Sequence, residues 1–239
     1  MSLFDAHTHL GRTSDPPRAQ GFYQLAVAST PEDCAFLEGL ARQDPKIYFA
    51  CGIHPWYSAD LSVESLGPWL SCCHAIGEIG MDSVWCNVDV EVQRQVFRTQ
   101  LALAEAWHKP IVLHTKGCER EVLEELEGFS QGMLVHWYSS PDYLMNYLKK
   151  GCYFTVGPDL SQNPAVQALV DTVPLEKLML ESDGAGGLSW ALGREVHPEE
   201  IPSFLRKQVL LIAERKGLEP RQVSETLYSN AMRFVKHVP

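Results

Sequence analysis

The sequence lacks the features that would point to a membrane protein or a disulfide-bonded secreted domain. No apolar run reaches the roughly 18 residues that a membrane-spanning helix needs. The first residues contain no basic segment followed by an apolar one, so we expect no secretory signal. The 7 cysteines are an odd number and include no Cys-x-x-Cys pair, which disfavours a disulfide framework or a zinc knuckle. We therefore expect a cytoplasmic protein that does not associate with membranes.

Basic residues are also scarce, with 20 Lys and Arg against 30 Asp and Glu and a formal net charge of −10. Broad adhesion to nucleic acid depends on neutralising phosphates with Lys and Arg, so this balance disfavours a plain DNA-binding module. It does not exclude a nuclease, because bound metal ions can supply positive charge locally.

Short apolar runs alternate with longer helical stretches, which indicates βα units around a parallel sheet. The expected strands cover residues 3–9, 23–28, 47–53, 75–79, 111–114, 133–136, 152–156 and 177–180. Eight strands in 239 residues are typical of one TIM barrel, a (β/α)8 fold. We therefore predict an α/β protein with a single domain over residues 1–239.

Helices are expected after most of these strands, at residues 31–43, 62–70, 88–108, 119–127, 141–150, 164–170, 202–216 and 220–235. The first βα unit departs from this repeat. Between His9 and Tyr23 the chain is short and carries Pro16 and Pro17, so a full helix does not fit there. The predicted barrel is therefore distorted, with its first helix missing or shortened.

Residues that suit a metal site fall at the carboxyl ends of separate predicted strands, where the active site of such a barrel lies. The set comprises four histidines, one glutamate and one aspartate: His7, His9, Glu78, His114, His136 and Asp183. Taken singly, each has an ordinary interpretation: a hydrogen-bonded histidine, a surface turn at Glu78, or a helix cap at Asp183. Their joint placement favours a metal centre.

The ligand types narrow the choice of metal. Imidazole and carboxylate without thiolate favour Zn²⁺, Mn²⁺, Fe²⁺ or Co²⁺, or Mg²⁺ if water fills the remaining positions. Six ligands exceed the three that a single catalytic zinc takes from the protein. A pair of ions with a bridging carboxylate uses all six, and such a pair activates water for attack on a phosphoryl or carbonyl group.

Several motifs together resemble the TatD-type metal-dependent deoxyribonucleases of the amidohydrolase-like barrel superfamily. The matching segments are Phe4-Asp5-Ala6-His7-Thr8-His9, Gly52-Ile53-His54-Pro55, Gly77-Glu78-Ile79-Gly80-Met81-Asp82, Gln93, Phe97, Pro110-Ile111-Val112-Leu113-His114-Thr115-Lys116, Val135-His136-Trp137-Tyr138-Ser139, Leu180-Glu181-Ser182-Asp183 and Asn230-Ala231. They cover nearly the whole chain in order. The resemblance implies a distorted TIM barrel that hydrolyses DNA phosphodiesters with two divalent ions, Zn²⁺, Mg²⁺ or Mn²⁺.

The resemblance also implies roles for individual residues. His7, His9 and Asp183 would hold one metal ion, His114 and His136 would hold the other, and Glu78 would bridge the two. Asp183 would also orient or deprotonate the attacking water, which makes Asp183 and Glu78 the expected catalytic residues. His54 and Lys116 would contact the substrate phosphate, with Lys116 standing where the family usually has arginine.

The departures from the family pattern fall on segments that select substrate. After Asp183 the family usually has a small residue, then proline, then an aromatic; this chain has Gly184-Ala185-Gly186-Gly187-Leu188. The downstream Asn-x-Pro is replaced by Val196-His197-Pro198. We therefore predict metal-dependent hydrolysis and leave three substrate classes open: DNA, a small phosphoester, or a small amide or lactone. A non-catalytic metal-binding protein on the same fold is the more remote alternative.

Overall fold

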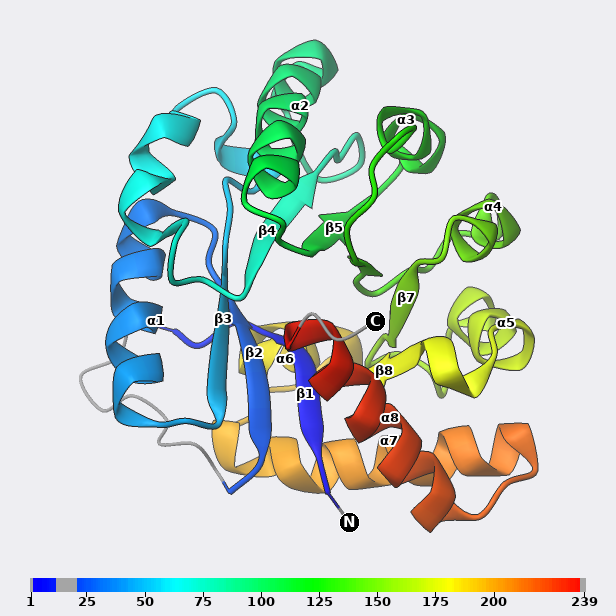
Figure 1. Ribbon diagram of the computed structural model, residues 1–239. Helices are drawn as coiled ribbons and strands as arrows, with labels where there is room; N and C mark the ends of the chain where they lie inside the picture. Colours follow the sequence, from blue (N-terminus) through cyan, green and yellow to red (C-terminus); the bar gives the residue numbers. More distant parts are fainter. Residues whose placement is uncertain (1, 12–20, 237–239) are drawn as a thin grey trace.

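Eight parallel strands close into a barrel in the computed structural model, which describes residues 2–11 and 21–236 (Figure 1). The strands pair in chain order, and the last pairs with the first. They are β1 (Phe4–Thr8), β2 (Tyr23–Val27), β3 (Ile47–Cys51), β4 (Ala75–Gly80), β5 (Ile111–His114), β6 (Met133–Val135), β7 (Tyr153–Val156) and β8 (Leu178–Leu180). The predicted TIM barrel is confirmed, and each predicted strand ends within two residues of the observed one.

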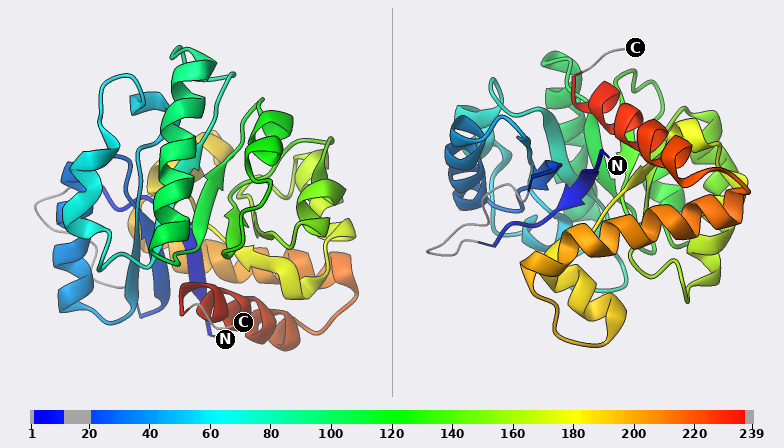
Figure 2. Two further views of the ribbon diagram at one scale, coloured as in Figure 1. Left: turned by 45° about the horizontal axis from the view of Figure 1, so that its top comes forward. Right: turned by 90° about the horizontal axis from the view of Figure 1, so that it is seen from below.

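Helices cover the outside of this barrel (Figures 1 and 2). They include α1 (Pro31–Gln43), α2 (Val90–Ala106), α3 (Glu119–Glu125), α4 (Leu144–Lys149), α5 (Pro164–Thr172), α6 (Gly184–Leu192), α7 (Ile201–Lys216) and α8 (Pro220–Val235). The segment expected at 62–70 is a 3₁₀ helix, η2 (Val63–Trp69). No helix in the described part of the chain is both long and apolar enough to cross a membrane.

Helix α6 was not predicted from the sequence. Three of its first four residues are glycine, which is the weakest helix former after proline. Packing stabilises the helix despite this low propensity, because Leu188 and Ala191 are buried on one of its faces. The segment that departs from the family pattern is therefore a helix and not an open loop.

The connection between β1 and β2 bears on the predicted loss of the first helix. Residues 9–11 and 21–22 of this connection are not helical. The rest of the predicted gap, residues 12–20, lies outside the described residues. The prediction of a missing or shortened first helix therefore agrees with the ends of the connection and is untested in its middle.

Helix α8 covers the amino-terminal end of the barrel. Tyr228 of this helix packs against Tyr23 and Phe4, at ring-centroid distances of 5.6 and 6.4 Å. Phe234 joins the apolar cluster that fills this end of the barrel with Phe4 and Leu25. Closing this end leaves the opposite end of the barrel, where the strands finish, as the place for a binding site.

Asn230 fixes α8 to the start of β8. Its side-chain Nδ2 donates hydrogen bonds of 2.8 Å to the carbonyl oxygens of Leu175 and Leu178, and the residue is 2% exposed. Because the hydrogen bonds are buried, removing the donor leaves carbonyl groups without a replacement from water.

We expect Asn230→Ala to lower the free energy of unfolding by about 1–3 kcal/mol, the cost of breaking buried hydrogen bonds. Urea denaturation followed by circular dichroism measures this change. Ser229→Ala is the matched control, because Ser229 is exposed on the same helix. Equal stability of the two variants would contradict this role for Asn230.

Candidate metal centre

Glu78 lies at the centre of a group of histidines at the carboxyl end of the barrel. Its Oε2 atom faces the Nε2 atoms of His7 and His9, each at 3.4 Å. Its Oε1 atom faces His114 Nδ1 at 2.7 Å and His136 Nε2 at 2.8 Å. The two oxygens of one carboxylate are therefore divided between two pairs of histidines.

Asp183 completes the first of these groups. Its Oδ1 atom lies 3.4 Å from His7 Nε2 and 3.5 Å from His9 Nε2. The structure thus brings together all six residues predicted as metal ligands. His7 is also close to His136, with ring centroids 4.0 Å apart, so the six form one continuous cluster. Their assignment to particular ions remains a prediction.

Bulges in two strands orient the central side chains. In β1 the register advances from Asp5 to Thr8 while the partner strand β2 advances only from Gln24 to Ala26. In β4 it advances from Ile76 to Ile79, again three residues against two in β5. Such an extra residue re-aims the side chains around it, and bulges are frequent beside active sites. The bulges flank His7 and Glu78.

Two further carboxylates face the histidines of the second group. His114 Nε2 lies 3.1 Å from Asp82 Oδ2, and His136 Nδ1 lies 3.6 Å from Glu181 Oε2. In each case the nitrogen that faces Glu78 is the other one of the ring. This carboxylate–histidine pairing is what metal-ligating histidines commonly show, because it fixes the ring and leaves one nitrogen free for the metal.

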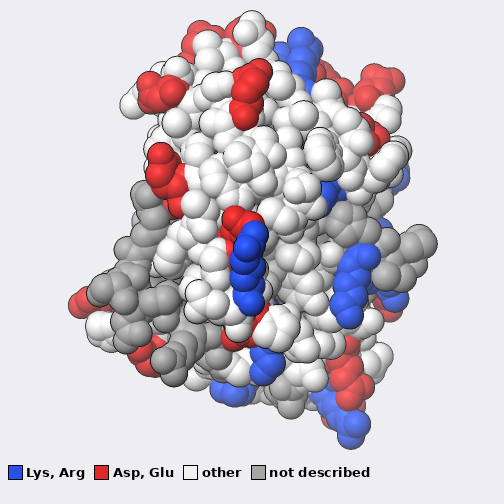
Figure 3. Space-filling view, turned by 60° about the vertical axis from the view of Figure 1, so that its left-hand side comes forward, with Lys and Arg blue, Asp and Glu red and all other residues white. Residues whose placement is uncertain are grey.

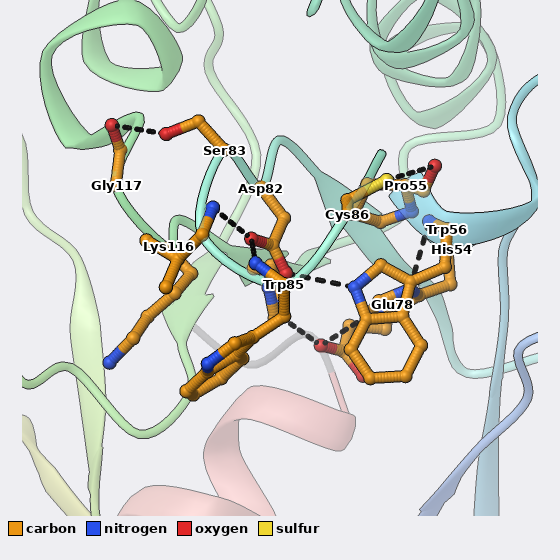
Figure 4. Close-up of polar contacts among 12 residues, drawn as sticks. His54, Pro55, Trp56, Glu78, Asp82, Ser83, Trp85, Cys86, Lys116 and Gly117 are labelled. Carbon is orange, nitrogen blue, oxygen red and sulfur yellow. Dashed lines mark hydrogen bonds and ion pairs between the residues drawn. The ribbon is translucent and has the colours of Figure 1, made fainter. Parts of the chain in front are cut away.

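Asp82 is itself held in place by several donors (Figure 4). It accepts hydrogen bonds from the indole Nε1 of Trp56 and from the backbone amides of Val84 and Trp85, each at 2.8 Å. Burial acts to raise the pKa of Asp82, but hydrogen bonds from His114, the Trp85 amide and Trp56 lower it well below its usual range. Asp82 is thus an ionised, fixed partner for His114.

His54 differs from His114 and His136 in the partner of the ring nitrogen that faces away from Glu78, which is a backbone amide and not a carboxylate. Its Nδ1 accepts a hydrogen bond of 3.2 Å from the Trp56 amide, and its Nε2 lies 3.4 Å from Glu78 Oε1. Burial lowers the pKa of His54 despite the nearby charge of Glu78, which favours the neutral ring. A neutral ring that accepts at Nδ1 carries its proton on Nε2. His54 therefore presents a donor to the cavity.

The carboxylates of the cluster are ionised, and the imidazoles balance their charge. Burial would raise the pKa of Glu78, but the charge of His136 and contacts with the other histidines hold it well below its ordinary value. Burial would lower the pKa of His9, but the hydrogen bond with Glu78 and the charge of Asp183 raise it to about 9. Protons thus occupy positions where divalent ions would supply the same charge.

The donor set fits divalent metal ions. His7 Nε2 and Asp183 Oδ1 are buried and have no hydrogen-bond partner, although they face each other at 3.4 Å. Buried polar atoms are rarely left unsatisfied, so these two atoms indicate a missing ligand. Nitrogen and oxygen donors without thiolate suit Zn²⁺, Mn²⁺ or Mg²⁺. The geometry therefore supports candidate His/Glu metal sites here.

The cluster forms the floor of a cavity of about 460 Å³. Its walls are largely aromatic and include Trp56, Tyr57, Trp85, Trp137 and Trp190. Among the described residues that line it there is no Lys or Arg. The predicted phosphate contact Lys116 lines a smaller adjoining cavity of about 70 Å³, which shares His114 and His136 with the first.

Two groups of site residues were missed from the sequence. Asp82 and Glu181 lie inside motifs that were recognised. The available signal was a second carboxylate, four residues after Glu78 in one motif and two residues before Asp183 in the other. Their function depends on which histidine each one faces, and sequence spacing does not reveal that. The tryptophans of the cavity wall come from separate segments of the chain, so no local pattern connects them.

Comparison with known proteins agrees with this geometry. The family model described as TatD related DNase matches residues 4–236. The chain belongs to the TatD-related DNase family. An uncharacterized metal-dependent hydrolase of Bacillus subtilis (strain 168), YabD, is 25% identical over 98% of this chain and 99% of its own length.

Other members of the family are similar over most of the chain. A protein of Citrobacter rodentium named 3'-5' ssDNA/RNA exonuclease TatD is 23% identical, over 82% of this chain and 79% of its own. The crystal structure of the TatD homologue YJJV from Escherichia coli has a TM-score of 0.82 at 22% identity, and covers 99% of this chain and 98% of that one. That similarity shows a shared fold.

Two of the glycines of α6 lie where the structure leaves no room for a side chain. A Cβ atom at Gly187 would lie 2.3 Å from Asp183 Oδ2, and Gly184, whose φ is +71°, would place one 2.5 Å from the His9 carbonyl. Any side chain at these positions would press on Asp183 or on the backbone of His9. By contrast, Gly186 has no atom within 4 Å of such a position. The start of α6 therefore packs directly against the candidate ligands.

We expect Gly187→Ala to lower the free energy of unfolding by about 1–3 kcal/mol, because the new methyl group overpacks the site and displaces Asp183. Gly186→Ala is the matched substitution on the same helix. It should raise stability by about 0.5–1 kcal/mol, since alanine favours the helix and the space is open. Thermal and urea unfolding measure both, and a neutral Gly187→Ala variant would contradict the close packing.

Proposed function

We propose that this protein is a two-metal-dependent nuclease that hydrolyses DNA phosphodiester bonds. The observation that carries the proposal is the division of Glu78 between two groups of histidines, with Oε2 facing His7 and His9 and Oε1 facing His114 and His136. Membership of the TatD-related DNase family supports the substrate class, and the named activity of the Citrobacter rodentium relative supports phosphodiester chemistry.

In this proposal His7, His9 and Asp183 would hold one ion, His114 and His136 would hold the other, and Glu78 would contribute to both. When bound, the two ions supply Lewis-acid polarisation of the phosphoryl group and lower the pKa of water. Asp82 and Glu181 keep His114 and His136 in the orientation that ligation needs, because each pairs with the ring nitrogen that does not face Glu78.

Glu78 and Asp183 differ in exposure, and from this difference we infer different roles for them. The Glu78 side chain is 2% exposed and enclosed by imidazoles, so it stays ionised and structural. The Asp183 side chain is 18% exposed and lines the cavity, so it can reach a water molecule. Asp183 accepts the proton of the water that attacks phosphorus while the phosphorus–oxygen bond to the leaving group breaks. His54 donates its Nε2 hydrogen to a phosphate oxygen.

A small phosphoester, amide or lactone substrate is the second candidate. The described lining of the main cavity has no Lys or Arg, and its volume of about 460 Å³ suits a compact substrate. A non-catalytic metal-binding protein is less well supported, because the complete set of candidate ligands remains.

Metal-loaded protein should hydrolyse single-stranded DNA, and chelation should abolish this activity. Glu78→Gln and Asp183→Asn should each reduce kcat by about 10²–10⁴-fold, the range for lost acid–base or electrostatic groups. His197→Asn is the control, because His197 is exposed and lies outside the cavity lining. Turnover of amides or lactones, with none of phosphodiesters, would replace the nuclease by the second candidate.

His54→Ala should leave two metal ions per chain and raise KM for DNA about tenfold, because it removes one hydrogen bond to a charged phosphate. His136→Ala should instead lose about one equivalent of metal. Elemental analysis after gel filtration, combined with steady-state kinetics, separates the two. If His54→Ala also loses one equivalent of metal, then His54 is a ligand and not a substrate contact.

A further inference from the structure

Three tryptophans from different parts of the chain meet at the rim of the cavity. Trp190 belongs to α6, Trp85 to the loop between β4 and α2, and Trp137 follows β6. The ring centroid of Trp190 lies 5.8 Å from that of Trp85 and 5.5 Å from that of Trp137, with interplanar angles of 69° and 75°. These residues, the tryptophan rim, form a continuous aromatic wall beside the candidate metal centre.

The tryptophan rim exposes much apolar surface. Trp190 is 65% exposed and Trp85 is 50% exposed. Burying an aromatic ring stabilises a fold, so exposed tryptophans gathered at a cavity indicate a binding surface rather than a structural element. Both residues line the 460 Å³ cavity whose floor is the Glu78 cluster.

The side chain of Trp137 is held in place by hydrogen bonds and packing. Its backbone amide donates to Thr155 Oγ1 at 2.9 Å, and its indole Nε1 donates to Asp159 Oδ1 at 2.8 Å. Its ring lies directly against Gly157, where a Cβ atom would be 2.2 Å from the indole. A ring held at both ends loses little conformational freedom when a ligand stacks nearby.

Positive charge at the rim is limited to one described side chain. Lys116 Nζ lies 4.6 Å from the centre of the Trp85 ring and 2.8 Å from Ser139 Oγ, and Figure 4 shows it beside Trp85. On the face drawn in Figure 3, Lys and Arg side chains are scattered among acidic and uncharged ones. An extended run of phosphates would find few cations here, whereas the flat face of a base would find several rings.

We propose that Trp85, Trp137 and Trp190 form a stacking subsite for one unpaired nucleobase next to the cleaved phosphate, with Lys116 contacting the phosphate of that same nucleotide. This inference rests on the proposed nuclease function and deepens it. Recognition at this subsite depends on the π face of the base, so it tolerates all four bases. Trp190 lies on α6, the segment where this chain departs from the family pattern, so the subsite includes a residue from that segment.

The test compares base removal in the substrate with ring removal in the protein. Metal-loaded wild-type, Trp190→Ala and Trp190→Phe proteins are assayed on a single-stranded tetranucleotide and on versions with a tetrahydrofuran abasic residue at each position. Trp190→Ala should raise KM about 5- to 100-fold on the natural substrate, with kcat within about twofold and partial recovery in Trp190→Phe. Trp107→Ala is the control, since Trp107 is 46% exposed at the end of α2, away from the cavity.

Removing the base at one position of the tetranucleotide should raise KM of the wild-type protein as much as Trp190→Ala does on the natural substrate. On that abasic substrate, Trp190→Ala should raise KM no further. Equal KM values for wild type and Trp190→Ala, or a loss that is the same at every abasic substrate, would overturn the subsite.

Quenching of tryptophan fluorescence by the tetranucleotide, measured in chelator, provides a readout that needs no turnover. If no phosphodiester is hydrolysed but quenching disappears in Trp190→Ala and with one abasic position, the nuclease proposal fails and the subsite stands. If DNA is hydrolysed and quenching is the same in wild type and Trp190→Ala, the nuclease proposal stands and the subsite fails.

Discussion

The buried carboxylate of Glu78 is the constraint on which the rest of the site depends. A charge in a barrel interior is costly unless opposite charge and hydrogen bonds compensate it. Five histidines converge on its two oxygens, and Asp183 faces two of them. Because so much charge is packed together, each side chain can hold only one orientation. That orientation is also the one in which divalent ions could replace the protons.

Residues around the Glu78 cluster hold its side chains in place. Asp82 and Glu181 orient the second group of histidines, and Trp56 in turn holds Asp82. Between β1 and β8, Asp5 accepts hydrogen bonds from the amide and hydroxyl of Ser182, so the two strands that carry the first group are fixed together. Burial raises the pKa of Asp5 to about 8 against these hydrogen bonds. Contacts with the surrounding barrel therefore hold the candidate metal centre in place.

The wall of the cavity differs in chemistry from its floor. The floor is polar, charged and tightly fixed, whereas the wall presents tryptophan faces with Lys116 as the one described cation of the rim. Helix α6 connects the two. Its glycines allow it to approach Asp183, and the same helix carries Trp190 to the mouth. A change in this segment would thus alter substrate contact without removing any candidate ligand.

Strand positions, the parallel barrel and the six convergent residues followed from the sequence, because apolar periodicity and the strand-end rule are local or topological properties. The sequence did not reveal the bulges beside His7 and Glu78, since an extra residue in a strand appears only when the partner strand is paired with it. It also gave no sign of helix α6, whose glycines are favoured only by close packing on Asp183. The partners of His114 and His136 and the meeting of the three tryptophans are contacts between distant segments. Such contacts depend on how the chain closes in space, so the tertiary structure alone decided them.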